Sequence, residues 1–428
     1  MRIWVVAGEY PSQEKPGRGS FVADQVAALR AEGHDVEVFE SCPPSLRPAA
    51  NAARPALRAL LGRLPRPGRP RGAEASPGDR HEDHHAGAAV KEPVNRPVST
   101  VAARVRKEAL LAARVAHDAA GIAVARRRMR TAMGAAADRG LPDVIHAHNV
   151  FPAGLAAADV AAALRVPYVV TEHSTAYLRD QYAPREVAAA RRVLGGANAV
   201  IAVSSTLASG LPVAHDRVDV VPNVVMVDDF RLRSPEASRS GSIVSIGRLT
   251  PHKRMDLVLR AYALLPSDLR ERHPLRIVGS GPDRDVLVAL ADSLGVGSRD
   301  GGRGVLCGQL TREQIVDELA GASLLVSASA VETFGVTMIE ALAGGVPFVA
   351  TDSGGPRDIA GPGLGELVEG DDPEVLAGVL ARALTDQAGD DCSNQAADHE
   401  RRRVAVDRYG PAAIASHLVE IYLRVVGT

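Results

Sequence analysis

The sequence predicts an α/β protein with two Rossmann-like, doubly wound domains, and three observations support this prediction. The chain has 428 residues, more than one ordinary hydrophobic core accommodates. Short apolar runs alternate with segments of helical period in both halves, which is typical of β-α units. A polar stretch at residues 231–240 separates the two series. Ligands of such domains bind outside the carboxyl ends of the strands, so we expect the chemistry in a cleft between the domains.

The first half opens as a parallel β-α-β unit. Patterning predicts a strand over residues 2–7, a helix over 20–32 that Gly33 ends, and a strand over 35–39. Regular alternation returns later in this half. It predicts a strand over 143–147, a helix over 153–163, and strands over 167–171 and 199–203.

A change of composition interrupts this series. From about residue 43 to residue 100 the chain is rich in Pro, Arg, Gly and Ala without a helical or strand period, which predicts a mobile insertion. The acids and histidines from His81 to His85 have the composition of a metal site. No predicted strand or helix holds them in place, so we interpret this cluster as solvated. A basic helical segment is expected over about 101–133.

This region is strongly basic. Between residues 44 and 130 there are eighteen basic and seven acidic side chains, including Arg126, Arg127 and Arg128. Such an excess suits contact with anionic lipid and predicts peripheral association with a membrane surface. The alternative is an ordinary solvated, arginine-rich linker and helix.

The second half repeats the β-α pattern. Strands are predicted over residues 243–247, 275–279, 304–307, 323–327 and 347–351, with helices between them. The last periodic segment, Pro411–Val426, predicts a helix long enough to reach back across the cleft.

The bulk composition excludes several classes of protein. With 50 basic and 51 acidic residues the net charge is -1, so we expect no nucleic-acid partner. Cys42, Cys307 and Cys392 lack paired spacing, which argues against a disulfide framework or zinc module and suits a reducing cytosol. No signal peptide and no run of eighteen uncharged apolar residues is found, so the expected location is cytoplasmic.

Two acids, Glu332 and Glu340, bracket the most informative segment of the chain. The residues three and four positions from Glu340 are small or apolar: Val336, Thr337, Ala343 and Gly344. A carboxylate in such surroundings needs hydrogen-bond donors, and a ribose or a hexose has the hydroxyls to supply them. The alternative is an exposed Glu on a short surface helix.

Cations and turns near the predicted strand ends suit a phosphate. Arg248 follows the strand over 243–247, and Lys253 lies five residues later, before a predicted helix. Two cations and free backbone N–H groups at a helix N-terminus would bind a diphosphate, although a solvated basic turn is the alternative. Two further turns could also approach phosphate with backbone N–H groups. They contain Gly279 and Gly281 after the next strand, and Thr333, Phe334 and Gly335 before the helix of Glu340.

Histidines mark the strand ends of the first half. His146 and His148 lie on one side of the strand over 143–147, and we expect the outer one, His148, to face the cleft and His146 to be structural. No third ligand stands at metal-binding spacing, so we predict no metal site. Gly19, before the first helix, could let the backbone approach a donor phosphate or an acceptor.

In combination and order, these motifs resemble the retaining family 4 glycosyltransferases, which have the two-domain GT-B fold. The resemblance covers nearly all of the chain, and one local departure is Pro222–Met226, where many relatives have Pro-Asn-Gly-Val-Asp. It is carried by five segments: Gly247–Lys253, Val278–Pro282, Glu332–Glu340, Ala341–Pro347 and Ser353–Pro356.

The resemblance implies roles for the candidate residues. Arg248 and Lys253 would neutralise the diphosphate of a nucleotide sugar, Glu332 would contact the donor sugar, and Glu340 would hold the ribose. In this family, a histidine at the position of His148 contacts the donor sugar. The segment with Glu172 and His173 is similar to the family's acceptor-side loop. The backbone of Phe334, Gly335, Val336 and Thr337 would line the phosphates.

It also implies a domain plan. Residues 1–225 would form the acceptor-binding domain, 226–240 the linker and 241–405 the donor-binding domain, with a C-terminal helical segment over 406–428 that crosses back.

The expected function is transfer of a sugar from a UDP- or GDP-linked donor to a hydroxyl acceptor, with retention at the anomeric carbon. The acceptor would be a glycan, a lipid-linked molecule or a small molecule. No cofactor and no metal ion are expected, because the two cations could stabilise the departing diphosphate. Two rivals remain: a catalytically silent nucleotide-sugar-binding partner subunit, and a nucleotide-sugar epimerase of GT-B-like architecture.

Overall fold

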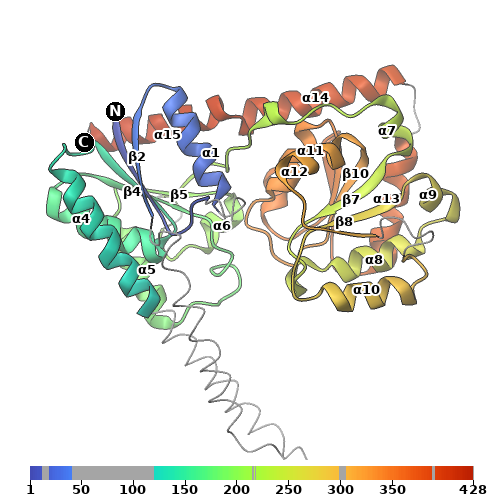
Figure 1. Ribbon diagram of the computed structural model, residues 1–428, viewed down its shortest axis with the longest axis horizontal. Helices are drawn as coiled ribbons and strands as arrows, with labels where there is room; N and C mark the ends of the chain where they lie inside the picture. Colours follow the sequence, from blue (N-terminus) through green and yellow to red (C-terminus); the bar gives the residue numbers. More distant parts are fainter. Residues whose placement is uncertain are drawn as a thin grey trace, which may run out of the picture. The chain divides into compact units, whose positions relative to one another are not determined.

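Two parallel, six-stranded sheets form the framework of the protein (Figure 1). The computed structural model describes residues 1–11, 19–40, 120–214, 216, 218–297, 305–387 and 391–427. The strand orders are β2-β1-β3-β4-β5-β6 and β12-β11-β10-β7-β8-β9, and every pairing between these strands is parallel. In each sheet the strand order reverses beside the first strand, so the predicted doubly wound α/β class is confirmed.

The strands of the first sheet and most of the helices that cover it come from the first half of the chain. Each strand expected there is present within one residue at either end, and residues 125–137 are helical. The short strand β6 and the helices α5 and α6 were not expected. The elements are β1 (Arg2–Ala7), α1 (Ser20–Ala31), β2 (Asp35–Glu40), β3 (Val144–His148), η2 (Val150–Gly154), α4 (Leu155–Leu164), β4 (Tyr168–Glu172), α5 (Pro184–Gly196), β5 (Ala199–Ala202), α6 (Ser205–Gly210), β6 (Val218–Val220) and η4 (Val227–Asp229).

The second sheet follows the same plan. The expected polar stretch at 231–240 contains a short helix, α7, because Ser234 accepts the N–H of Ala237 and Pro235 occupies the first turn. The elements are α7 (Pro235–Ser240), β7 (Ser242–Ile246), η5 (Pro251–Lys253), α8 (Met255–Leu264), α9 (Ser267–Arg272), β8 (Leu275–Val278), α10 (Arg284–Ser293), β9 (Leu306–Gly308), α11 (Arg312–Ala320), β10 (Ala322–Ser327), α12 (Val336–Ala343), β11 (Phe348–Thr351), η6 (Gly355–Asp358), β12 (Gly365–Val368), α13 (Pro373–Asp386), α14 (Asp391–Tyr409) and α15 (Pro411–Val426).

Helices cover both faces of each sheet. Alternate residues of β1 enter different cores: Ile3 and Val5 pack with α1 and α15, whereas Trp4 and Val6 pack with Met129 and with α4 and α5. Figure 1 shows α4 and α5 on one side of the first sheet and α1 and α15 on the other. In the second sheet, α8, α10 and α13 share one core and α11 and α12 belong to another. The central strands are therefore buried on both sides.

The two C-terminal helices contact different halves of the chain. α14 packs against α12, and α15 packs against α1. The carbonyl of Tyr409, at the end of α14, accepts the N–H of Val225 (2.9 Å). Upstream, a buried ion pair between Arg233 and Asp398 (2.8 Å) fixes the segment before α7 to α14.

Some expectations concern residues outside the described ranges. The predicted insertion at 43–100, its His81–His85 cluster and Cys42 all lie there. Within the described ranges, none of the helices combines the length and the apolar character needed to cross a bilayer.

Candidate functional site

Lys253 and Glu332 meet where β7 and β10 end. Lys253 Nζ lies 2.5 Å from Glu332 Oε2, and both side chains are largely buried. The loops that carry them also touch through their backbones, since the N–H of Ala330 donates to the carbonyl of His252 (2.8 Å). A cation and a carboxylate, 79 residues apart in sequence, are thus fixed side by side at the carboxyl edge of the second sheet.

The loop of Glu332 is held by the segment after β11. The N–H of Glu332 donates to the carbonyl of Ser353 (2.9 Å), and the N–H of Gly355 donates to the carbonyl of Glu332 (2.8 Å). A Cβ atom at Gly355 would lie 2.5 Å from the backbone nitrogen of Phe334, so only glycine allows this approach. Gly355, in the segment Ser353–Pro356, therefore positions the Glu332 loop.

Gly279 and Gly281 have a packing role. A Cβ atom at Gly279 would lie 1.8 Å from the carbonyl oxygen of Gly247, and one at Gly281 would lie 2.1 Å from that of Leu249. Gly279 also has a positive φ of 144°. Both glycines let the loop after β8 contact the loop after β7. This contact alone explains why glycine occupies both positions, without any contact with a ligand.

Positive charge surrounds Lys253. Arg248 is exposed and forms no ion pair with another residue in the described ranges. Burial lowers the pKa of His252, and the charges of Arg179 and Lys253 lower it further. Arg179 belongs to the segment between β4 and α5, so this segment of the first half lies within electrostatic range of the loop after β7. The site would attract an anion.

Glu340 lies on α12 near a cation from α11. Burial raises the pKa of its carboxyl to about 7, while the charge of Arg312 acts against this shift and that of Asp24 adds to it. The Arg312 guanidinium contacts Asp24 on α1 (3.4 Å) and Asp229 (2.9 Å). Glu340 therefore belongs to an electrostatic group that joins the two halves of the chain.

At the start of α12 the Phe334 side chain belongs to the core, whereas the backbone N–H groups are available to a ligand. Phe334 is 2% exposed and packs against Tyr409, so its ring belongs to the core. Gly335 is the N-cap of α12, and the helix begins with the half-buried Val336 and Thr337. Backbone N–H groups at this helix start are available to an anion. At the first sheet, Gly19 is likewise the N-cap of α1.

A chain of buried polar side chains occupies the carboxyl edge of the first sheet. His146 contacts Tyr422 on α15 (2.6 Å) and Thr171 on β4 (2.7 Å). Gln25 Nε2 on α1 lies 3.4 Å from His146 Nδ1 and 3.3 Å from His148 Nε2. His148 Nδ1 in turn lies 3.0 Å from His173 Nε2. Gln25 on α1 and Tyr422 on α15, which take part in these contacts, come from remote parts of the sequence.

The expectation that His148 faces a cleft is wrong for this conformation. His148 is 1% exposed, and Gln25 and His173 occupy its two ring nitrogens. His173 is half-buried and is the outermost ring of the three. The structural role expected for His146, which is fully buried, is confirmed.

Glu172 is not exposed to an acceptor either. Its carboxylate is fully buried and accepts the backbone N–H groups of Val150, His173 and Ser174. Burial raises its pKa to about 7, although these three hydrogen bonds act against the shift. The acceptor-side contact expected for Glu172 is therefore corrected to a contact with the loop backbone.

Sequence reasoning missed Gln25, Tyr422 and Arg312. For Gln25 a signal existed, because it lies in the buried stripe of α1 between Val22 and Val26, where an apolar residue is the rule. No such signal marks Tyr422 or Arg312, since their partners come from other elements.

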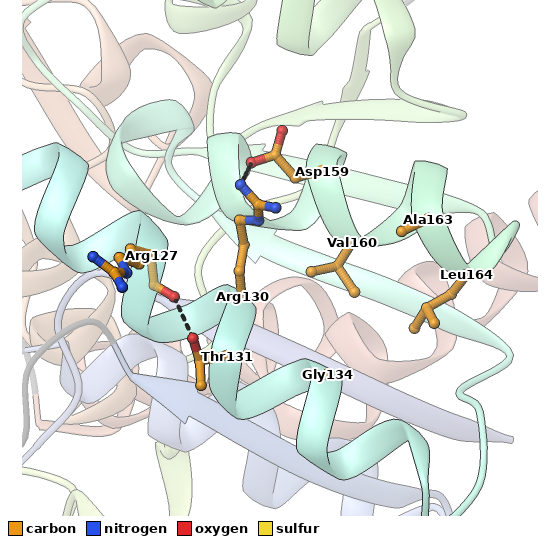
Figure 2. Close-up of a pocket in the computed structure, with 8 residues that line it drawn as sticks. All are labelled: Arg127, Arg130, Thr131, Gly134, Asp159, Val160, Ala163 and Leu164. Atoms are coloured by element: carbon orange, nitrogen blue, oxygen red, sulfur yellow. Dashed lines mark hydrogen bonds and ion pairs between the residues drawn. The ribbon is translucent and has the colours of Figure 1, made fainter.

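One hollow lies away from these strand ends. It has a volume of about 460 Å³ between the helical residues 125–137 and α4 (Figure 2). Asp159 of α4 binds Arg126 (2.6 and 2.7 Å) and lies 3.6 Å from Arg130. Helices of β-α-β units run antiparallel to the strands, so the end of α4 at Leu164 lies toward the amino ends of the strands. Its lining is Arg127, Arg130, Thr131, Gly134, Asp159, Val160, Ala163 and Leu164.

The described residues contain no group of three or more His, Cys, Asp or Glu side chains placed to hold a metal ion. In the same ranges the histidine chain and the Lys253–Glu332 pair form no hydrogen bond with each other. The candidate residues thus form two groups, one at the carboxyl edge of each sheet.

Comparison with known proteins gives consistent matches. The family described as Glycosyltransferase Family 4 matches residues 17–229, and the one described as Glycosyl transferases group 1 matches residues 227–402. The putative teichuronic acid biosynthesis glycosyltransferase TuaC of Bacillus subtilis is 27% identical over 396 residues, which are 89% of each chain. A D-inositol 3-phosphate glycosyltransferase of Frankia alni is 32% identical over 310 residues, 64% of this chain and 70% of the relative.

Solved structures of similar fold include Anabaena HepE in complex with UDP and glucose. It is 17% identical, with a TM-score of 0.61 over 98% of each chain. Sucrose-phosphate synthase from Thermosynechococcus elongatus is 20% identical, with a TM-score of 0.65 over 100% of this chain and 99% of that one. At these identities the likeness shows the fold, which confirms the predicted GT-B class.

The buried histidines should make the protein less stable in acid. Burial lowers the pKa of all three in the folded state, to about 3 for His146 and His173. Below pH 6.5 the unfolded chain therefore binds protons that the folded chain excludes, and each histidine lowers the free energy of unfolding by up to about 1.4 kcal/mol per pH unit. Glu172 and Glu340 oppose this, because with pKa values of about 7 they bind protons in the folded state at a pH where the unfolded carboxyls are ionised.

Glu340→Gln tests this balance, since it removes one of the opposing groups. Between pH 6.5 and pH 5, we expect the variant to lose stability more steeply than wild type, by at most about 1.4 kcal/mol per pH unit in urea unfolding. Asp285→Asn, at a 99% exposed side chain, is the control and should leave the slope unchanged. Equal slopes for wild type and Glu340→Gln would contradict the assigned environment of Glu340.

Proposed function

The chain belongs to glycosyltransferase family 4, and we propose that it moves a sugar from a nucleotide diphosphate donor to a hydroxyl acceptor with retention at the anomeric carbon. One observation carries the donor assignment. Lys253 and Glu332 place a cation and a carboxylate 2.5 Å apart at the carboxyl edge of the second sheet. The diphosphate of a donor would accept a charge-assisted hydrogen bond from the cation, and the hydroxyls of the adjoining sugar would donate hydrogen bonds to the carboxylate.

The donor would replace the ion pair with two ligand contacts. The diphosphate would accept hydrogen bonds from Lys253 and from the exposed Arg248, and the carboxylate of Glu332 would then accept from sugar hydroxyls. Glu340 would hold the ribose, and the backbone at the start of α12 would approach the phosphates. A UDP-linked sugar is the first donor to test, because HepE of similar fold is solved with UDP-glucose; a GDP-linked sugar is the second.

The proposed chemistry requires no divalent ion. Arg248 and Lys253 would stabilise the negative charge that develops on the departing diphosphate. The acceptor hydroxyl would attack from the same face of the sugar and pass its proton to the departing phosphate, so Glu332 positions the donor and is not a base. His146 and His148 are buried, so the half-buried His173 is the histidine through which the first half would contact the substrate.

The proposed acceptor is an envelope glycan or a small molecule. Relatives described as a teichuronic acid biosynthesis glycosyltransferase and as D-inositol 3-phosphate glycosyltransferases support an envelope glycan or a small molecule. A lipid-linked glycan would bring the enzyme to the inner face of the membrane.

Donor binding can be measured by calorimetric titration with UDP- and GDP-linked sugars. For Lys253→Ala we expect a loss of roughly 1.5 to 3 kcal/mol, about tenfold or more in Kd, because a charge-assisted hydrogen bond to phosphate disappears. The matched control is Arg254→Ala, which removes the next cation in the chain, one that pairs with Asp371 instead. Equal effects of both substitutions, or no binding of any donor by wild type, would refute the assigned diphosphate site.

Turnover of the bound donor separates this proposal from its rivals. With a suitable acceptor, the enzyme should release nucleotide diphosphate, keep its rate in EDTA, and give a product whose anomeric configuration by NMR matches that of the donor. A silent binding subunit would release no nucleotide. An epimerase would convert the donor sugar in the absence of any acceptor.

The basic helical segment supports a peripheral membrane association. Arg127 and Arg128 are exposed, and the hollow beside them is lined by Arg127, by Arg130, which pairs with Asp159, and by the apolar Val160 and Leu164 (Figure 2). This combination suits the phosphate and the adjoining acyl chain of an anionic lipid.

Sedimentation with liposomes of anionic and neutral phospholipid tests the association. Replacing Arg127 and Arg128 together by Ala should weaken binding to anionic vesicles by about 1 kcal/mol per arginine at low salt. The control replaces Arg191 and Arg192, two exposed arginines of α5, and should have little effect. Wild-type protein that stays in the supernatant with anionic vesicles would remove the membrane proposal.

A further inference from the structure

The carboxylate of Glu172 joins two loops that follow neighbouring strands. It accepts the N–H of Val150 (2.9 Å) from the segment after β3, and those of His173 (3.0 Å) and Ser174 (2.9 Å) from the segment after β4. One side chain thus satisfies three backbone donors that no longer belong to the sheet. Because Glu172 is fully buried, its carboxylate lies out of reach of a ligand.

The hydrogen bonds of this carboxylate link the two segments beyond the point where the strand pairing ends. The β3–β4 ladder pairs His148 with Thr171, and its last hydrogen bond runs from the N–H of Asn149 to the carbonyl of Thr171 (2.8 Å). Beyond that point the two segments separate, and the next link between them is the bond from Val150 to Glu172. The side-chain oxygen of Asn149 adds a second acceptor for the N–H of His173 (3.0 Å).

The two loops carry the histidines of the candidate site. His148 and His173 are stacked, with ring centroids 5.3 Å apart and a hydrogen bond of 3.0 Å between ring nitrogens. On its other side the His173 ring contacts Phe21 of α1, with centroids 4.4 Å apart. The direction of the His173 ring therefore depends on where its backbone is held, and Glu172 and Asn149 hold that backbone.

We propose that Glu172 is a positioning residue for glycosyl transfer: it fixes the backbone of His173, so that the His173 ring keeps its contact with His148 and its direction toward the substrate. The part of this inference that concerns the direction toward the substrate rests on the proposed function. The contact between His173 and His148 can be tested independently of that function. Glu172 itself touches neither donor nor acceptor.

A carboxylate is suited to this task in a way that an amide is not. Above its pKa of about 7 the carboxyl is ionised and both of its oxygens accept, and three N–H groups from two directions converge on them. Glutamine has nearly the same volume but presents an NH2 group to at least one of these donors, which leaves that N–H unpaired. Glu172→Gln therefore changes the hydrogen bonds while it leaves the packing nearly intact.

The experiment compares Glu172→Gln with the matched control Glu186→Gln. Glu186 also accepts a backbone N–H, that of Ala183 at the start of α5, but lies outside the histidine chain. By hydrogen exchange, we expect the amides of Val150, His173 or Ser174 to exchange at least about tenfold faster in Glu172→Gln, because one buried hydrogen bond is lost. In protein labelled with ¹⁵N in its histidine rings, the resonances of His148 and His173 should shift in Glu172→Gln and stay in place in Glu186→Gln.

The kinetic arm uses UDP-glucose as the probe. Glu172→Gln should lower kcat for its turnover by about tenfold or more, because a misplaced contact group loses its effect in the transition state. The Kd for UDP should stay within about twofold of wild type, because the assigned diphosphate site lies on the other sheet. If Glu172→Gln does not fold, Glu172→Asp serves instead, since its shorter carboxylate keeps the charge but reaches fewer of the donors.

Three outcomes would overturn the proposal: unchanged exchange of the loop amides, unchanged ring resonances, or faster loop exchange with kcat unchanged, which would make Glu172 purely structural. If wild type neither binds nor turns over UDP-glucose or the other nucleotide sugars, the proposed function fails at the donor site. The exchange and ring resonances then still decide whether Glu172 positions His173, so the two failures are distinguishable.

Discussion

Burial of both faces of each parallel sheet is the constraint on which the rest of the structure depends. The strands β3, β4 and β5 are buried along their whole length, so polar side chains have water or ligands within reach only where a strand ends. Because parallel strands end at the same edge, chemistry separated by many residues in the chain converges there. Lys253 and Glu332 meet at one such edge, and His148 and His173 meet at the other.

Two buried or half-buried carboxylates at these edges are satisfied in different ways. Glu332 is held by the ammonium of Lys253, and a phosphate that competes for this cation would release the carboxylate to a sugar. Glu172 is held by three backbone N–H groups, and no ligand can replace these without moving the loops. The first arrangement is suited to exchange with a substrate and the second to a fixed framework.

Sequence reasoning predicted the strands closely, because apolar runs of fixed length directly reflect two-sided burial. It found α15 with its bounds, Pro411–Val426, for a similar reason, since its buried stripe repeats with helical period. It did not find β6 and β12, whose three and four residues carry too little pattern, and it expected His148, which is 1% exposed, to face the cleft. The strand register showed that His148 is the outer histidine, but the cover over it comes from Gln25 on another element.

By itself, the sequence determined the two β-α series, the family resemblance and which residues stand at strand ends, since all of these depend on spacing along the chain. Only the tertiary structure decided what each side chain at those ends contacts. It paired Lys253 with Glu332 and turned Glu172 away from the surface toward loop backbone. The physical reason is that a polar group is satisfied by whatever donor or charge the fold brings near, and those partners lie far away in the sequence.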